Sequence, residues 1–496
     1  MMLPPPLLRR SAKIPHRGSR GLVGGLNFLN FRARNSVLAA LLLTATPTAA
    51  QQPTSVAPAR PVADYQRAIA AGYKAAMLCS GLFNAGRTPE QVQADELGGI
   101  YTEYQPLLVG LSPQIDRARG RVAVPFAADL PPRWSVWNAA TGCTTMPIGW
   151  APPSDARNTA MARPAPTRPQ GSPADWPMGD RAPPPRPPRA LADTVARAFD
   201  RASYGAGSKT VGVLVLRDGT IRAERYAEGF GPFTSNRTWS VAKSIAGTLI
   251  GAAIQQGVAI DPRRPASLSQ WPAGDPRARI TLDQLMRMAS GLHSDTAGNR
   301  TDAIYFGGTA VTDQAPGWPL EAAPGTRFRY ANNDILLAVL ALRQRLGDQR
   351  YASFPRDALF APLGMRNTLA ETDWRGNYIL SSQVWSTARD LGRLGQLWLQ
   401  DGMWAGRRLL PQGWVATMTT PSGPQPAEGP GYGATMWLFG PEQGLPAGSF
   451  AAQGNRGQYV MVIPARRLVV VRRGEDPGPA RFDIARFAAD VAAALP

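Results

Sequence analysis

The sequence predicts an α+β fold, in which an antiparallel sheet is flanked by helices, carries a helical subdomain and is preceded by an N-terminal extension. Strand-like alternation of apolar and polar residues occurs at 211–226 and again at 431–439, 458–463 and 468–472. The chain between these two groups is mostly helical in its apolar periodicity. Strands at both ends of one unit, with helices inserted between them, favour a single sheet closed by early and late segments.

The N-terminal region has a mixed pattern. Residues 64–99 are helical in periodicity, and Thr88 is a candidate helix cap because Pro89 follows it at the first helical position. Two short strands are expected at 121–127 and 134–141.

A proline-rich segment separates this region from the rest of the chain. Twelve Pro residues lie within 152–189, which excludes a helix or a central strand, so we expect an extended linker or a strap over another surface. The expected organisation is therefore an N-terminal region at 51–151, this linker, and a larger domain at 190–496.

The larger domain begins with an amphipathic helix at 190–203 and a hairpin at 211–226, whose turn is marked by Asp218-Gly219. A helix is expected from Ser240 to about residue 256, where Gly257 ends it. Further helices are expected at 282–289, 334–346, 387–399, 412–418 and 480–495.

The first 50 residues carry seven basic side chains and no acidic one, then a short apolar run from Ser36 and small residues at Thr48-Ala49-Ala50. A basic start, a short apolar core and small residues before a cleavage point are typical of a secretory signal peptide. We therefore expect removal of residues 1–50 and a periplasmic or secreted protein, with a disordered basic tail as the alternative. No apolar run reaches the roughly 18 residues of a membrane span, so we expect no stable span.

The chain has 496 residues and a formal net charge of +19, but this charge does not identify a partner. Of the 54 basic residues, four are Lys and the other 50 are Arg, mostly scattered among prolines without a basic stripe or a nucleic-acid-binding motif. We attribute the excess of positive charge to composition bias and surface charge, and we expect no nucleic-acid partner. The alternative, a protein that binds anionic polymers, is supported by the net charge alone. Two His and two Cys do not supply a zinc site, and we expect no metal and no cofactor.

Cys79 and Cys143 are the only cysteines of the chain. In an exported protein they can pair, and the difference 143 − 79 = 64 gives a loop whose closure would contribute roughly 4 kcal/mol. Two buried free thiols are the alternative.

Ser240 and Lys243 form an S-x-x-K sequence at the start of a predicted helix, so their side chains lie on one face within reach of each other. A cation in a first helical turn opposes the helix dipole, and Lys, unlike Arg, can lose its proton when it is desolvated. One of the four Lys residues of the chain stands at this position. The pair suits a nucleophile and its base; a surface Lys beside an unrelated Ser is the alternative.

Two further segments carry candidate groups. Tyr330 and Asn332 are two residues apart, and a Tyr hydroxyl near a Lys ammonium can share a proton, although alone these residues fit a core Tyr and a helix-capping Asn better. Gly454 and Asn455 lie between late strands, where glycine lets a backbone N–H approach a ligand and serve an oxyanion hole. An ordinary glycine-containing turn is the alternative.

Together, the S-x-x-K, Tyr-x-Asn and glycine-containing strand motifs, in this order, resemble those of the penicillin-binding-protein-like serine hydrolases. From about residue 190 to its end the chain is most similar to class C β-lactamases, family VIII esterases and 6-aminohexanoate-dimer hydrolases, with support from 285–292, 386–395 and 402–411. The resemblance implies a β-lactamase-like fold and an enzyme that cleaves an ester or amide bond of a small molecule or a peptide-like substrate. It does not explain the N-terminal region beyond extensions found in some relatives.

By this resemblance Ser240 is the acylated nucleophile and Lys243 accepts its proton. Tyr330 relays protons to the leaving group and later from the deacylating water, and Asn332 positions the substrate. The backbone N–H groups of Ser240 and Asn455 form the oxyanion hole.

The third motif departs from the family pattern. β-Lactamases have Lys-Thr-Gly there and many esterases have His-x-Gly, whereas this chain has Ala452-Gln453-Gly454, so the charged group that holds a β-lactam carboxylate is missing. Gly454, Asn455 and Arg456 are assigned to substrate binding, with Asn332. Arg456 either substitutes for the missing cation or is a solvated turn residue. The departure favours an esterase or amide hydrolase.

The leading hypothesis is therefore an exported serine hydrolase that forms an acyl-enzyme on Ser240. One alternative is a β-lactamase or D-alanyl-D-alanine carboxypeptidase that acts on cell-wall-type substrates. Another is a non-catalytic periplasmic binding or sensor module that keeps the fold. A Ser-His-Asp triad would have to use His293, the only His beyond residue 50, which we interpret as a turn residue or part of the cleft rim.

Overall fold

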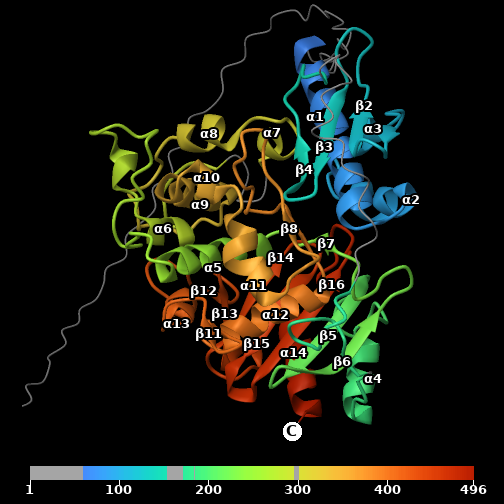
Figure 1. Cartoon of the computed structure of the whole chain (residues 1–496), viewed down its shortest axis with the longest axis vertical. Coiled ribbons are helices and arrows are strands. Elements are labelled where there is room, and N and C mark those ends of the chain that lie inside the picture. The colour runs from blue at the N-terminus through green and yellow to red at the C-terminus, as the bar shows by residue number, and fades with distance from the viewer. Residues whose placement is uncertain (1–59, 153–170, 184, 295–300, 496) are drawn as a thin grey trace, which may run out of the picture. The chain divides into compact units, whose positions relative to one another are not determined.

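The larger domain is built on one seven-stranded antiparallel sheet, in the order β12-β13-β14-β15-β16-β5-β6 (Figure 1). The computed structural model describes residues 60–152, 171–183, 185–294 and 301–495, so the expected signal peptide at 1–50 lies outside the described residues. Strand β16 pairs with β5, which confirms that early and late segments close one sheet. The strands are β5 (Thr210–Arg217), β6 (Thr220–Tyr226), β12 (Gly431–Tyr432), β13 (Trp437–Phe439), β14 (Ser449–Gly454), β15 (Gln458–Ile463) and β16 (Leu468–Gly474).

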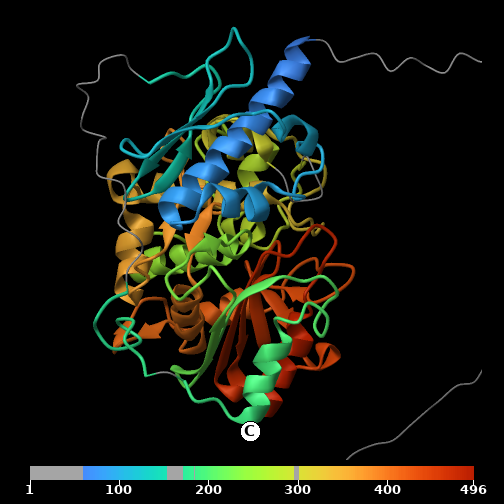
Figure 2. The ribbon, with the colours of Figure 1, turned by 90° about the vertical axis from the view of Figure 1, so that its right-hand side faces the viewer.

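Helices cover both faces of this sheet. Successive side chains of β5 point to opposite faces, and its valines and leucines are all buried, so both faces must be covered. Val213 and Val215 point to the face where α4 and α14 pack, and α4 lies in front of the sheet in Figure 2. Leu214 and Leu216 point to the opposite face, against α12 and next to α5. The four covering helices are α4 (Arg189–Arg197), α5 (Val241–Gln255), α12 (Ala388–Leu399) and α14 (Ile484–Ala494).

The predicted helical subdomain lies between the early and late strands of the sheet. Its helices are α6 (Leu282–Met286), α7 (Asp302–Tyr305), α8 (Val311–Gln314), α9 (Asn332–Leu346), α10 (Asp348–Tyr351), α11 (Ala361–Leu363) and α13 (Trp414–Thr419). Its short strands are β7 (Asn236–Arg237), β8 (Leu369–Ala370), β9 (Val384–Ser386), β10 (Met403–Trp404) and β11 (Arg407–Arg408).

The prediction of a single strand at 431–439 is wrong. The segment forms two paired strands, β12 and β13, because the chain reverses between them, with Thr435 at a positive φ of 65°. The sequence prediction also omitted β14 as a strand of its own, although its last residue, Gly454, belongs to the third motif.

The N-terminal region combines helices with a four-stranded antiparallel meander, β1-β2-β3-β4. Its elements are α1 (Arg60–Cys79), α2 (Pro89–Val92), α3 (Gln105–Leu108), β1 (Gln114–Asp116), β2 (Arg121–Val124), β3 (Arg133–Asn138) and β4 (Gly142–Thr145). The predicted cap is confirmed, because the Thr88 side chain accepts from the Gln91 N–H at the start of α2. Strands β1 and β4 were not predicted from the sequence.

A disulfide joins the two parts of this region. Cys79, at the end of α1, is bonded to Cys143 in β4, with 6.1 Å between their Cα atoms. Of the two alternatives that the sequence left open, the structure therefore shows the pair.

Buried Glu371 ties the N-terminal region to the larger domain. Its Oε1 accepts from Ser80 Oγ at 2.5 Å, from Asn84 Nδ2 at 2.8 Å and from the Cys143 N–H at 3.2 Å. Burial raises the pKa of Glu371 to about 7. Consistent with these contacts, residues 58–496 form one compact unit.

The described end of the proline-rich segment lies on the larger domain as a strap. The Trp176 indole N–H donates to the Gly219 carbonyl at 2.7 Å. The Arg393 guanidinium donates to the carbonyls of Pro177 and Gly179 at 2.7 and 2.6 Å. Among the described residues, no helix has the length and apolar character needed to cross a membrane.

Part of the arginine excess lies inside the protein, not on its surface. The largest fully buried side chains include Arg133, Arg237, Arg393, Arg472 and Arg473. For these residues the interpretation as surface charge is wrong. A guanidinium has five N–H donors in a fixed fork, so one side chain can satisfy several buried carbonyl groups at once.

Candidate active site

Ser240 stands at a sharp turn into helix α5. The preceding residue, Trp239, has a positive φ of 50°, a conformation that bulky residues rarely adopt. Ser240 returns to φ −69° and ψ −4°, and α5 begins at Val241. The turn leaves Ser240 partly exposed, whereas nearly all of the helix behind it is buried.

Lys243 lies one turn into α5 and is only 1 % exposed. Its Nζ donates to Ser240 Oγ at 2.9 Å, to Asn332 Oδ1 at 2.6 Å and to the Ser381 carbonyl at 2.8 Å. Burial lowers the pKa of Lys243 to about 7, because an enclosed ammonium loses its hydration. A substantial fraction of Lys243 is therefore neutral near pH 7, within reach of the Ser240 proton.

Tyr330 lies over the same amine, with 4.9 Å between its ring centroid and Lys243 Nζ. Its ring packs against Tyr432 and Trp437, with centroid distances of 6.0 and 5.5 Å. Burial raises the pKa of Tyr330, and a hydrogen bond with Ser240 partly opposes this rise. The phenol therefore stays protonated at neutral pH, as a proton donor next to Ser240 must be.

Asn332 begins α9 and is buried beside these groups. Because its Oδ1 accepts from Lys243, the Asn332 amide holds the amine in place as well as lining the cleft.

Strand β14 brings the glycine motif against the nucleophile segment. A Cβ on Gly454 would lie 2.3 Å from the Thr238 carbonyl oxygen and 3.1 Å from the Ser240 backbone nitrogen, so only glycine allows this approach. Asn455 follows at the end of the strand and is exposed. The segments that carry the Ser240 and Asn455 N–H groups are therefore neighbours.

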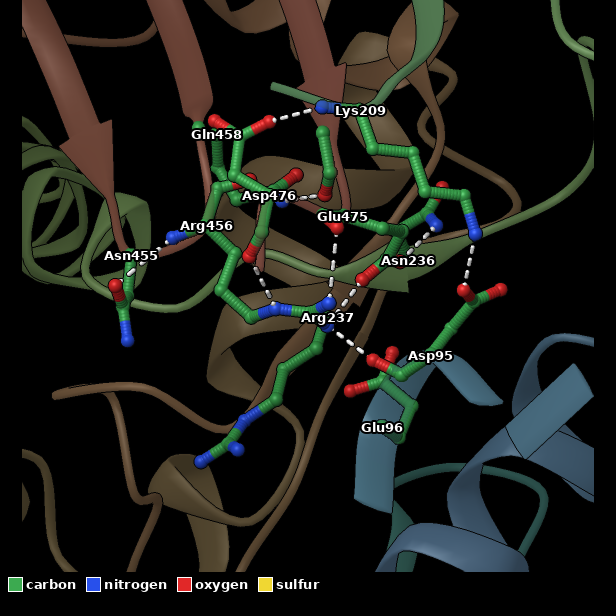
Figure 3. A network of polar contacts seen from close by, with 12 residues as sticks. Asp95, Glu96, Lys209, Asn236, Arg237, Asn455, Arg456, Gln458, Glu475 and Asp476 are labelled. Carbon is green, nitrogen blue, oxygen red and sulfur yellow. Dashed lines mark hydrogen bonds and ion pairs between the residues drawn. The ribbon is translucent and has the colours of Figure 1, made fainter. Parts of the chain in front are cut away.

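Arg456 is turned away from the role of a carboxylate-binding cation. Its guanidinium donates to Glu475 Oε2 at 2.5 Å, to the Asp476 carbonyl at 3.0 Å and to the Asp95 carbonyl. Figure 3 shows it directed toward Glu475 and Asp95, whereas the Asn455 side chain lies on the other side of the Arg456 backbone, where its Oδ1 accepts from the Arg456 N–H at 2.9 Å. Arg456 is 8 % exposed, so the alternative prediction of a solvated turn residue is wrong as well.

The candidate residues border one cavity of about 640 Å³, with Lys243 in the wall behind Ser240. Aromatic rings form much of its lining. They come from Tyr101, Trp239, Tyr305, Tyr330, Trp437 and Tyr459.

Some functional contacts gave no signal in the sequence. The Ser381 carbonyl holds Lys243 from a loop 138 residues away. Ile100, Tyr101 and Glu103 of the N-terminal region also line the cavity. No motif marks these residues, because only the folding of distant segments brings them to Ser240.

His293 lies apart from Ser240, Lys243 and Tyr330. Its Nδ1 is bonded to Glu321, and it is not among the residues that line the cavity of Ser240. This placement agrees with the interpretation of His293 as a turn residue.

Comparison with known proteins agrees with this geometry. The fold and the Ser–Lys site define a serine hydrolase of the β-lactamase fold. The Beta-lactamase family model matches residues 195–494, more than half of the chain, so the chain belongs to this family. The resemblance inferred from the motifs and the predicted fold class are thereby confirmed.

Individual relatives support the same assignment. The chain is 28% identical over 301 residues to the 6-aminohexanoate-dimer hydrolase of Paenarthrobacter ureafaciens, covering 54% of this chain and 72% of the relative. A penicillin-binding-protein homologue from Caulobacter crescentus has a TM-score of 0.51 at 18% identity, over 62% of this chain and 98% of the other. A family VIII carboxylesterase has a TM-score of 0.50 at 16% identity, over 62% and 97%. At these identities the two structures show the fold alone.

Proposed function

We propose that this protein is an exported serine hydrolase that cleaves an ester or amide bond through an acyl-enzyme on Ser240. One observation carries the proposal. The amine of buried Lys243 lies 2.9 Å from Ser240 Oγ, and its pKa is lowered to about 7. A base poised near the working pH beside a hydroxyl is what nucleophilic catalysis by serine requires.

In the acylation step Ser240 Oγ attacks the substrate carbonyl carbon while Lys243 Nζ takes the hydroxyl proton. The carbonyl oxygen becomes an oxyanion, which the backbone N–H groups of Ser240 and Asn455 stabilise. The proton then passes through the Tyr330 hydroxyl to the leaving oxygen or nitrogen as the bond to the carbonyl carbon breaks.

Deacylation repeats these transfers with water. Lys243 Nζ takes a proton from the attacking water through the Tyr330 hydroxyl, a second oxyanion forms in the same place, and the proton returns to Ser240 Oγ as its bond to the acyl carbon breaks. Asn332 keeps the Lys243 amine aligned throughout and positions the substrate.

The third motif and the contacts of Arg456 support a substrate with an uncharged acyl group. Ala452 occupies the place where β-lactamases carry a Lys, and the Arg456 guanidinium donates to Glu475 and to two backbone carbonyls. Arg456 is therefore not free to bind a substrate carboxylate at this end of β14, whereas Arg481, which also lines the cavity, is exposed and donates to the carbonyls of Gly478 and Ala480. β-Lactams and D-alanyl-D-alanine peptides carry such a carboxylate and remain the alternative substrates.

We further propose a periplasmic or secreted location. The basic and apolar start of the chain supports export, and so does the Cys79–Cys143 pair, because disulfides persist mainly in oxidising compartments. The mass of the protein purified from the periplasm or the medium tests this. Loss of about the first 50 residues is expected, whereas a full-length chain confined to the cytoplasm would contradict it.

Labelling separates the functional candidates. A fluorophosphonate probe is expected to label the wild type and to leave Ser240→Ala unlabelled, with Lys243→Arg labelled far more slowly. A fluorescent penicillin tests the alternative in parallel, and labelling by penicillin alone would favour it. Labelling by neither probe would contradict the catalytic proposal and favour a non-catalytic binding or sensor module. Comparison of short-chain esters with linear amides then narrows the substrate.

A further inference from the structure

The two N–H groups of the proposed oxyanion hole lie beside strained backbone. Trp239 precedes Ser240 with a φ of 50°, and Arg456 follows Asn455 with a φ of 57°. Residues with side chains seldom adopt such angles unless surrounding contacts hold them. The alignment of the two N–H groups therefore depends on what packs against Trp239 and Arg456.

Arg456 is held from several directions. Besides Glu475 Oε2 and the Asp476 carbonyl, its guanidinium donates to the Glu475 carbonyl at 3.0 Å and to the Asp95 carbonyl of the N-terminal region (Figure 3). The Asp476 N–H returns a bond to the Arg456 carbonyl at 3.3 Å. The turn after Asn455 is thus tied on both sides.

A second group of N-terminal contacts supports this network. Arg87 pairs with Asp95 at 2.5 Å and with Glu475 at 3.6 Å, so it bridges the N-terminal region and the larger domain. Lys209 pairs with the other oxygen of Asp95 at 2.5 Å. All of these groups except Lys209 are almost fully buried, so solvent screens the interactions little.

Trp239 contacts one side chain of the larger domain and one of the N-terminal region. The Arg237 guanidinium carbon lies 3.9 Å from the centroid of its ring. On another side is Tyr101, with 6.4 Å between the ring centroids. Tyr101 packs in turn on Tyr73 of α1, at 5.0 Å, and on Phe306, at 5.5 Å.

We propose that the N-terminal region is a working part of the active site, which aligns both halves of the oxyanion hole, with Arg456 as the positioning residue on the Asn455 side. This inference rests on the proposed function. It assigns a role to residues 87–101, which lie outside the part of the chain that the family model matches.

The test compares two buried arginines. Arg456→Lys keeps the charge but cannot reproduce the forked bonds. Arg393→Lys is the matched control, because Arg393 is also buried and its guanidinium also donates both to carboxylates, Asp180 and Asp390, and to backbone carbonyls, but it lies on α12 and does not line the cavity. Arg456→Lys is expected to lower kcat for ester hydrolysis roughly 10- to 100-fold with KM changed less than about threefold. Arg393→Lys is expected to change kcat less than about threefold.

Affinity for an oxyanion mimic distinguishes alignment from simple destabilisation. A boronic acid that forms a tetrahedral adduct on Ser240 should bind Arg456→Lys more weakly by the same factor as the loss in kcat/KM, and bind Arg393→Lys normally. Added guanidinium at millimolar concentration should restore part of the activity of Arg456→Gly, since glycine accepts the positive φ. If Arg456→Lys does not fold, Arg87→Gln serves in its place, with a kcat loss in the same direction.

The possible failures are distinguishable. If wild type shows no Ser240-dependent labelling or hydrolysis, the proposed function is overturned and this inference with it. If wild type is active but the Arg456 and Arg393 variants lose kcat and boronate affinity equally, only this inference is overturned.

Discussion

At the scale of single residues, Lys243 shows how burial changes the chemistry of a side chain. The same amine on the surface would stay protonated far above neutral pH. The Lys243 side chain on α5 is buried, and its amine is hydrogen-bonded to three oxygen atoms, those of Ser240, Asn332 and Ser381. None of these oxygen atoms carries a formal charge. Desolvation therefore lowers its pKa without a carboxylate to oppose the shift.

This predicts the pH dependence of activity. The neutral amine is the active form, and its fraction rises as pH increases through the Lys243 pKa of about 7. We expect kcat/KM for ester hydrolysis to fall about tenfold per pH unit below that value and to be level above it. The raised pKa of Tyr330 keeps the phenol protonated on the alkaline side.

The control for this profile is Asp334→Asn. Asp334 also has a pKa raised to about 7 by burial, but it binds Ser290 instead of Lys243. The variant should keep the profile of the wild type. A flat profile between pH 5 and 9 for the wild type, or loss of the acid limb in Asp334→Asn, would contradict the assignment of Lys243 as the base.

Gly454 predicts a second effect at the residue scale. In Gly454→Ala the new Cβ would meet the Thr238 carbonyl 2.3 Å away, so β14 must move away from Ser240. We expect kcat to fall at least about tenfold and the free energy of unfolding to fall by about 1–3 kcal/mol. Gly440→Ala is the control, because Gly440 has extended backbone and open space around its Cβ position. Equal kcat in both variants would exclude a close approach of β14 to Ser240.

At the scale of elements, the disulfide joins α1 to β4 across a separation of 64 residues. Both sulfur atoms are buried, and Glu371 binds Ser80 and the Cys143 N–H beside them. The bond thus fixes the part of the N-terminal region that contacts the larger domain.

Removal of the Cys79–Cys143 disulfide should lower the free energy of unfolding. For Cys79→Ala/Cys143→Ala we expect the free energy of unfolding by urea to fall by roughly 4 kcal/mol, from the loop-closure entropy. Reductant added to the wild type should produce the same loss and should leave the double variant unchanged. A loss smaller than about 1 kcal/mol, or a further effect of reductant on the double variant, would count against the pairing as a stabilising element.

At the scale of the whole molecule, the compact unit is larger than the family match. The match covers residues 195–494, whereas the unit extends over 58–496. Tyr101, Asp95 and Glu371 take part in contacts that join the additional segment to the rest. The N-terminal region is thus part of the folded hydrolase and contributes to its interior.

Two cuts of the chain test this. A specific protease site introduced into the proline-rich segment 152–189 should allow cleavage with retention of activity, and the two fragments should elute together, because buried contacts such as Ser80–Glu371 and Arg87–Glu475 hold them without a covalent link. A chain that begins at residue 190 should be inactive or insoluble, since Glu371 and Trp239 would lose their buried partners. An active, cooperatively folding chain from residue 190 would show that the N-terminal region is dispensable.

Local sequence patterns were sufficient to predict much of the structure of this protein. The β5–β6 hairpin, α5, the α2 cap at Thr88 and the Ser240–Lys243 pair depend on neighbours within a few residues, which the sequence displays directly. The ordered motifs also indicated the family. The pairing of Cys79 with Cys143 was left as one of two alternatives, because spacing alone does not show proximity.

The tertiary structure decided the rest, because the remaining properties arise from segments far apart in the chain. The charge of Arg456 suggested a substrate-binding cation, but Glu475 and the Asp95 carbonyl occupy its donors. The arginine excess suggested surface charge, but side chains such as Arg473 are buried and bind carbonyl groups. Burial and long-range contacts determine what an ionisable group does, and neither is visible until the chain has folded.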